Sequence, residues 1–190
     1  MEAADRVMNI ADAHKLDKPE RLQWMPPNEI VALLPLAAGA VVADIGAGTG
    51  FFALPIAKAV APAGRVFAVD MQPEMLELLR KKLSVSGTPS NVELVHGKAD
   101  ATTLPDDSCD LIFIANVWHE LDQRDEVLAE MRRILGKNGR LAILDWRADV
   151  EPPLLDQALE PKKEQRLYWC VATSGVIRLP SIDHVGPIGS

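Results

Sequence analysis

The chain has 190 residues, 48% of them hydrophobic, and a formal net charge of -7. A core of this size predicts one domain, residues 1–190, and the acidic balance argues against nucleic acid or an anionic membrane as the main partner. No apolar stretch of the sequence is long enough to span a membrane and acidic residues interrupt the N-terminus, so we expect a cytoplasmic protein.

Residues 1–25 carry few apolar side chains among many charges. This pattern predicts short amphipathic helices that lie against a larger body, and we interpret them as a lid-like extension over a pocket of the core. Removing such a lid should leave ligand binding by the core itself nearly intact. The core is expected at residues 26–146. It opens with the prolines at 26 and 27, after which Asn28 is expected to cap a helix that ends near Pro35.

The most informative stretch is VVADIGAGTG at residues 41–50. An apolar strand interrupted by Asp44 leads into glycines at 46, 48 and 50, a pattern typical of a ligand-binding turn between a strand and a helix. A dinucleotide fingerprint requires another spacing, because Phe51 stands where its third glycine belongs, and a P-loop pattern is absent. A glycine turn without a ligand stays open as the alternative.

A second apolar run, RVFAVD, ends in Asp70, 20 residues after Gly50. A carboxylate at the end of a second strand can accept hydrogen bonds from both hydroxyls of a ribose. The two patterns together favour an adenosine-containing ligand.

Strands and helices then alternate along the chain. The predicted elements are strand 41–45, helix 50–61, strand 65–70, helix 73–84, strand 91–96, strand 110–115, helix 123–135 and strand 139–146. Apolar, non-alternating strands between amphipathic helices predict an α/β fold with a doubly wound, mostly parallel sheet.

The pattern is less regular after Trp146. Residues 147–161 are expected to form a loop, 162–173 a helix and 176–182 a strand, within an irregular C-terminal part at 147–190. A final strand is expected to be absent, so this end of the sheet would be shortened and left open or covered by a second subunit in a homodimer.

The motifs of residues 26–146 resemble those of class I methyltransferases of the ubiquinone/menaquinone C-methyltransferase type, the methyltransferase type 11 domain. The matching segments are DIGAGTG at 44–50, the Asp70 end of VFAVD, GKADATTLP at 97–105 and IANVWHEL at 114–121. The resemblance implies a Rossmann-like fold, S-adenosyl-L-methionine (SAM) as methyl donor and S-adenosyl-L-homocysteine as product.

The resemblance also implies roles for the first two motifs. Gly46, Gly48 and Gly50 would receive the methionine part of SAM, and Asp44 would hold its amino group. Asp70 would bind the ribose. A carboxylate inside an apolar strand needs a charged or hydrogen-bonding partner, and the SAM ammonium group is one.

The remaining cofactor positions follow from the same resemblance. Met71 would pack on the adenine, Asp100 would reach the adenine amino group beside Ala101, and the backbone of Asn116 would lie near the methionine amine. Ordinary packing is the alternative for Met71 and Ala101, and capping of a turn is the alternative for Asp100.

Acceptor recognition is predicted less sharply. Trp24, Trp118 and His119 are interpreted as pocket-mouth residues, with a structural aromatic and a surface histidine as the alternative for the last two. His119 and Glu120 begin an H-E-x-x-H zinc motif, but position 123 is Gln, so no metal is expected. The few basic residues nearby favour a small, largely uncharged or apolar acceptor.

The predicted function is therefore methyl transfer from SAM to a small molecule by in-line displacement, with no catalytic residue assigned. An arsenite acceptor is disfavoured, because Cys109 and Cys170 are the two cysteines of the chain. Two alternatives are a SAM-binding protein without turnover, owing to an incomplete C-terminal sheet, and a nicotinamide dehydrogenase.

Overall fold

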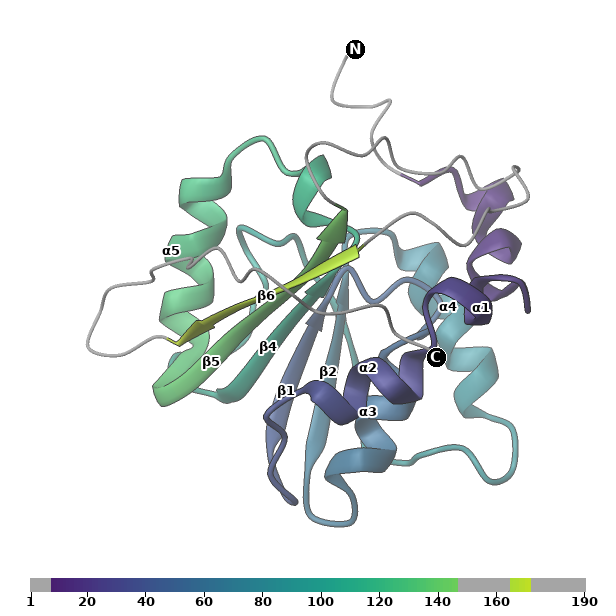
Figure 1. Ribbon diagram of the computed structural model, residues 1–190, viewed down its shortest axis with the longest axis horizontal. Coiled ribbons are helices and arrows are strands. Elements are labelled where there is room, and N and C mark those ends of the chain that lie inside the picture. Colours follow the sequence, from purple (N-terminus) through teal and green to yellow (C-terminus); the bar gives the residue numbers. More distant parts are fainter. Residues whose placement is uncertain (1–7, 147–164, 172–190) are drawn as a thin grey trace.

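The computed structural model describes residues 8–146 and 165–171 and places a six-stranded sheet between helices on its two faces (Figure 1). The strands are β1 (Val41–Ile45), β2 (Arg65–Asp70), β3 (Val92–His96), β4 (Cys109–Ala115), β5 (Leu135–Trp146) and β6 (Gln165–Val171). The helices are η2 (Ile10–Asp17), α1 (Arg21–Trp24), α2 (Pro27–Leu33), α3 (Ala53–Val60), α4 (Pro73–Leu83), η3 (Trp118–Glu120) and α5 (Arg124–Ile134), of which η2 and η3 are 3-10 helices.

Each face of the sheet contributes to its own apolar core, which explains the non-alternating strands. On one face Val42, Val66 and Phe113 pack with residues of α2 and α3. On the other face Ile45 and Ile112 pack with the apolar side of α5. The prediction of a doubly wound, mostly parallel sheet is confirmed.

The strand order β3-β2-β1-β4-β5-β6 places the site. The chain winds outward from β1 to β3 and then crosses to the other side of β1 to form β4, so the connections after β1 and β4 leave in opposite directions. Ligands of such sheets bind at this reversal, beyond the carboxyl ends of the strands. The glycine turn follows β1 at this point.

The C-terminal part differs from the prediction. Gln165–Val171 forms β6, antiparallel to β5, where a helix over 162–173 was expected. Its sequence, QRLYWCV, contains aromatic and β-branched residues that favour strands, and pairing satisfies the backbone groups along the edge of β5. The expected strand at 176–182, and the final strand whose absence was expected beyond it, lie outside the described residues.

The N-terminal boundary also shifts. Helix α2 begins at Pro27, with Pro26 as its N-cap, so Asn28 lies within the helix and does not cap it. Proline suits the first helical turn because its missing N–H has no partner there in any helix. Within the described ranges, no helix is long and apolar enough to cross a membrane.

Candidate functional site

The glycine turn folds tightly against its neighbours. Gly46 and Gly50 have φ values of 74° and 86°, in the left-handed region that side chains rarely adopt. A Cβ on Gly46 would lie 2.5 Å from Cγ2 of Val117, and one on Gly50 would collide with Leu79. The turn therefore requires glycine for both backbone conformation and space.

Asp44 is a buried carboxylate at the end of β1, 2% exposed. Among the described residues its Oδ2 has no hydrogen-bond partner. Burial, assisted by repulsion from Asp70, raises the pKa of Asp44 from 3.8 to about 7, although a hydrogen bond from the backbone of Ala53 acts in the opposite direction. A buried, unpaired oxygen with this electrostatic environment suits a cationic or hydrogen-bond-donating ligand.

Asp70 connects the end of β2 to the glycine turn. The Gly48 N–H donates to Oδ2 over 2.7 Å and the Gln72 N–H donates to Oδ1 over 2.9 Å. Burial raises the pKa of Asp70, while these two hydrogen bonds and the nearby His96 lower it. Each carboxylate oxygen keeps a further lone pair with which to accept a ligand hydroxyl.

The turn that carries Asp100 and Ala101 follows β3 and is joined to the backbone at the end of β2. Lys98 and Ala101 exchange backbone hydrogen bonds of 3.2 and 3.1 Å around the turn, and the Gly97 N–H donates to the backbone carbonyl of Asp70. Asp100 is half-buried. The hydrogen bond from Gly97 to Asp70 joins the ends of β2 and β3.

Met71 follows Asp70 with 46% of its surface exposed. His96 contacts the Met71 carbonyl through Nε2 at 3.1 Å. An exposed apolar side chain at the edge of the site can cover a flat ring, and its exposure argues against the alternative role as an ordinary packing residue.

Glu130 of α5 holds the loop after β3 and was not identified from the sequence. Its Oε1 accepts hydrogen bonds from the backbone N–H and the hydroxyl of Thr102, at 2.8 and 2.6 Å. Arg133 pairs with Glu130 and also donates to the Leu104 carbonyl over 2.8 Å. These contacts lower the pKa of Glu130 to about 2, so a charged clamp fixes the loop that follows Asp100.

Asn116 follows β4 with a φ of 56°, a left-handed conformation that Asn tolerates better than most residues. Its N–H donates to the Leu144 carbonyl over 2.8 Å, and its Nδ2 donates to the sulfur of Met25 over 3.5 Å. Val117 then packs against Gly46. The connection after β4 is thus in contact with the glycine turn.

His119 and Asp145 form a close pair at the ends of η3 and β5. Nδ1 of His119 lies 2.7 Å from Oδ1 of Asp145, and the His119 N–H donates to Oδ2 over 2.9 Å. The hydrogen bond to Asp145 raises the pKa of His119, partly offset by burial. With Nδ1 held by the carboxylate, the ring can exchange a proton at Nε2.

Glu120 adds a further carboxylate near this pair. Burial raises its pKa to about 7, with repulsion from Asp145 and Asp70 in the same direction and attraction to His119 in the opposite one. The carboxyl edge of the sheet therefore concentrates Asp44, Asp70, Glu120 and Asp145. Mutual repulsion between these groups favours a cationic ligand.

Of the two tryptophans predicted at the pocket mouth, the structure describes the side chain of Trp118. Trp118 is partly buried against the core on the α5 face, and the guanidinium carbon of Arg124 lies 5.6 Å from its ring centroid. Trp24 ends α1, but its side chain lies outside the described part of the structure. The acceptor roles of both stay predictions.

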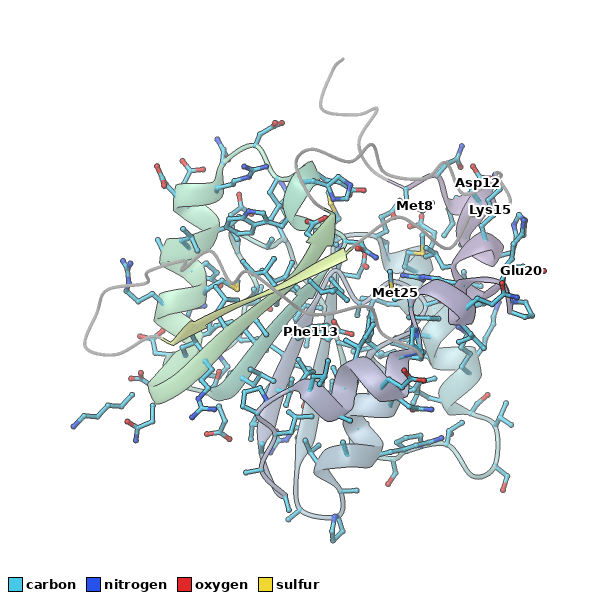
Figure 2. The ribbon with its side chains drawn as sticks, in the orientation of Figure 1. Met8, Asp12, Lys15, Glu20, Met25 and Phe113 are labelled. Carbon is cyan, nitrogen blue, oxygen red and sulfur yellow. The ribbon has the colours of Figure 1, made fainter. Side chains whose placement is uncertain are left out.

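The N-terminal segment, residues 8–25, lies over the glycine turn. Asp17 accepts hydrogen bonds from the Thr49 hydroxyl at 2.9 Å and from Lys82 at 2.6 Å. Gln72 donates to the Met8 carbonyl over 3.0 Å. In Figure 2, Glu20 points outward from this segment while Met25 lies toward the sheet. The segment thus contacts the expected cofactor edge itself.

Asp145 could have been identified from the sequence, since it ends the apolar run LAILD as Asp70 ends RVFAVD. Glu120 and Glu130 give no comparable local signal. Within the described ranges, no group of three or more His, Cys, Asp or Glu side chains is arranged to hold a metal ion.

The model of a family described as "Methyltransferase domain" matches residues 43–143. The chain is 36% identical over 115 residues to the ubiquinone/menaquinone biosynthesis C-methyltransferase of Hahella chejuensis, which covers 60% of this chain and 46% of that protein. The chain therefore spans about half the length of this relative.

Two solved structures of methyltransferases share the fold of this chain. A SAM-dependent methyltransferase from Aquifex aeolicus is 33% identical, covers 77% of this chain and 79% of its own, and superposes with a TM-score of 0.71. An arsenic(III) SAM methyltransferase from Chlamydomonas reinhardtii is 28% identical, with coverage of 67% and 51% and a TM-score of 0.53. The fold of the described core is that of these proteins.

Proposed function

We propose a function from one premise: the chain belongs to the methyltransferase domain family, whose model matches more than half of its residues. The proposed activity is transfer of a methyl group from SAM to a small-molecule acceptor. The 33% identity to the Aquifex SAM-dependent methyltransferase over most of both chains supports this activity.

The observation that carries the proposal is the carboxylate-lined edge around a glycine turn. Asp44 is buried and has an unpaired oxygen among the described residues, and Asp70 and Glu120 also have raised pKa values. SAM has a sulfonium and an ammonium group, whereas a dinucleotide would bring an anionic pyrophosphate to the same acids. Charge therefore favours SAM.

The residues present fit SAM at each of its ends. Asp44 would bind the ammonium group, and the glycine turn would admit the methionine chain close to the backbone. Asp70 would accept the ribose hydroxyls with the lone pairs that Gly48 and Gln72 do not use. Met71 would cover the adenine ring, and Asp100 would accept from its amino group beside Ala101.

The chemistry that SAM supplies is an electrophilic methyl group on a positively charged sulfur. The protein would contribute alignment, because Asp44 and Asp70 would hold the two ends of the donor relative to the connection after β4. Asn116 and Val117 form the wall beside Gly46. The N-terminal segment covers the turn and would keep water from the methyl group, so we retain it as a lid whose contacts reach the donor as well as the acceptor.

The acceptor is proposed to be a small, largely apolar or uncharged molecule. The name of the Hahella relative assigns it a C-methylation in ubiquinone and menaquinone biosynthesis, and a quinone-type ring fits this description. The cytoplasmic location and the homodimer stay predictions.

The test is tritiated methyl transfer from SAM into a metabolite extract, followed by separation by size. We expect label in the small-molecule fraction with the wild type and little with Asp44→Asn, which removes the charge with almost no change in volume. Label mainly in RNA, DNA or protein would contradict the small-molecule acceptor. SAM binding without label in any fraction would favour the alternative without turnover.

A further inference from the structure

Arg21 of α1 is a buried arginine without an ionic partner among the described residues. It is 8% exposed, and its Nε has no hydrogen-bond partner there. Nη1 donates to the Leu16 carbonyl over 2.9 Å, and Nη2 donates to the sulfur of Met25 over 3.6 Å. The guanidinium carbon lies 4.0 Å from the ring centroid of Phe51. A carbonyl, a thioether and an aromatic ring compensate a buried cation poorly.

The acid whose charge acts on Arg21 already accepts other hydrogen bonds. Asp17 raises the pKa of Arg21, but its Oδ1 accepts from both Thr49 and Lys82. Burial has the larger effect and lowers the pKa of Arg21 to about 10. Arg133 illustrates the usual arrangement, since it pairs with Glu130 and Asp106. Arg21 is therefore a buried cation that an additional anion would stabilise.

Arg21 lies at the same edge as the proposed SAM site. Phe51, beneath its guanidinium, directly follows Gly50. The sulfur of Met25 contacts both Arg21 and Asn116, which links the guanidinium to the connection after β4. Figure 2 shows Met25 between α1 and the strand ends, where this link is made.

The charges at the carboxyl ends of the strands indicate which anion Arg21 would bind. The amino-acid end of SAM has an ammonium and a carboxylate on the same carbon, so a site for one places the other within a few ångströms. Asp44, Asp70, Glu120 and Asp145 would repel that carboxylate. We infer that Arg21 binds the α-carboxylate of SAM, a role that rests on the proposed function. Stacking on Phe51 orients the planar guanidinium for a bidentate contact before the ligand arrives.

The test compares SAM with decarboxylated SAM, which keeps the sulfonium and the amine and lacks only this carboxylate. We expect wild-type protein to prefer SAM by about 10- to 100-fold in dissociation constant, the range for charge-assisted hydrogen bonds. Arg21→Met keeps much of the aliphatic stem and should reduce this preference to near unity. Arg21→Lys, which keeps the charge without the planar fork, should retain part of it.

Arg65→Met is the matched control. Arg65 also stacks on an aromatic ring, with its guanidinium carbon 5.5 Å from the ring centroid of Phe67. It begins β2, however, and so lies at the amino ends of the strands, opposite the proposed SAM site. Its preference for SAM should equal that of the wild type. The ratio is measured within each variant, so a lower folded fraction affects both ligands equally and cancels.

A preference that survives in Arg21→Met, or that is absent from the wild type, would overturn the role of Arg21 while leaving SAM binding established. Failure of the wild type to bind either ligand would instead overturn the proposed function. The two failures are therefore distinguishable.

Discussion

Asp44 is expected to affect stability and ligand binding in opposite directions. Its carboxylate titrates near 3.8 when unfolded and near 7 when folded, so the folded chain keeps a proton that the unfolded chain has released between these values. The unliganded protein should therefore lose stability as pH rises from about 4 to about 7. The raised pKa values of Asp70 and Glu120 have the same sign.

The substitution Asp44→Asn tests this balance. At pH 8 it should raise the melting temperature of the unliganded protein, because it removes a buried charge, and the gain should shrink at pH 5. It should also weaken SAM binding by about 1–3 kcal/mol through loss of the ionic partner of the ammonium. Calorimetric titration and thermal unfolding at both pH values measure the two effects. A variant that is less stable at pH 8 than the wild type would show that Asp44 has a structural partner.

Asp70 is expected to do more than bind ribose. Asp70→Ala should weaken SAM binding by about 1–3 kcal/mol, and it should also lower the stability of the unliganded protein, because Gly48 and Gln72 lose their acceptor. Asp70→Asn keeps one acceptor oxygen and should fall between the wild type and Ala in urea unfolding. Equal stability of all three proteins would refute the structural part of this role.

The residues of the site were predictable where the signal is local. Asp44 and Asp70 stand at the ends of apolar strands, where a charge is conspicuous. Arg21 was not predictable, because its burial depends on Phe51, 30 residues later, and on the fold of the N-terminal segment. Glu130 resembles any acid of a solvated helix until Thr102 is brought against it.

Helix α5 stabilises the loop after β3 through Glu130. Glu130→Gln should lower the free energy of unfolding by about 2 kcal/mol at pH 7, because charge-assisted hydrogen bonds from Thr102 and Arg133 are weakened. The pKa of Glu130 is lowered from 4.5 to about 2, so this stabilisation is present above pH 4.5 and is lost as pH falls toward 2.

Urea unfolding of both proteins at pH 7 and pH 3.5 checks this expectation. Glu126→Gln, an exposed position on the same helix, is the control and should change stability little. Hydrogen exchange in residues 97–105 should accelerate in Glu130→Gln. A loop that exchanges at the same rate in both proteins would exclude the clamp.

Secondary structure was predictable for the elements with a long, regular pattern. Helices α4 and α5 and strands β1 to β4 lie within three residues of their predicted bounds, because apolar spacing distinguishes period 3.6 from buried strands. Strand β6 was predicted as a helix, since a short segment carries little periodicity and its partner β5 is distant in sequence. Pairing with the edge of β5, together with the strand-favouring residues of QRLYWCV, decided the outcome.

At the scale of the whole molecule, the N-terminal segment, residues 8–25, crosses the carboxyl ends of the strands, where SAM is proposed to bind. A pure acceptor lid would leave SAM affinity intact when removed. The contacts of Asp17 with Thr49 and of Met8 with Gln72 instead favour a contribution to the donor site. Deleting residues 1–20, which keeps α1, should weaken SAM binding by about tenfold, the equivalent of one hydrogen bond. Unchanged SAM affinity with lost methyl transfer would restore the pure lid.

The most direct test of the central claim is calorimetric titration of the purified chain with SAM, S-adenosylhomocysteine and NAD at pH 7.5. The carboxylate-lined edge predicts that SAM and S-adenosylhomocysteine bind at least 100-fold more tightly than NAD, since clustered carboxylates oppose a pyrophosphate by roughly 3 kcal/mol or more. NAD binding at lower concentrations than either would contradict the claim.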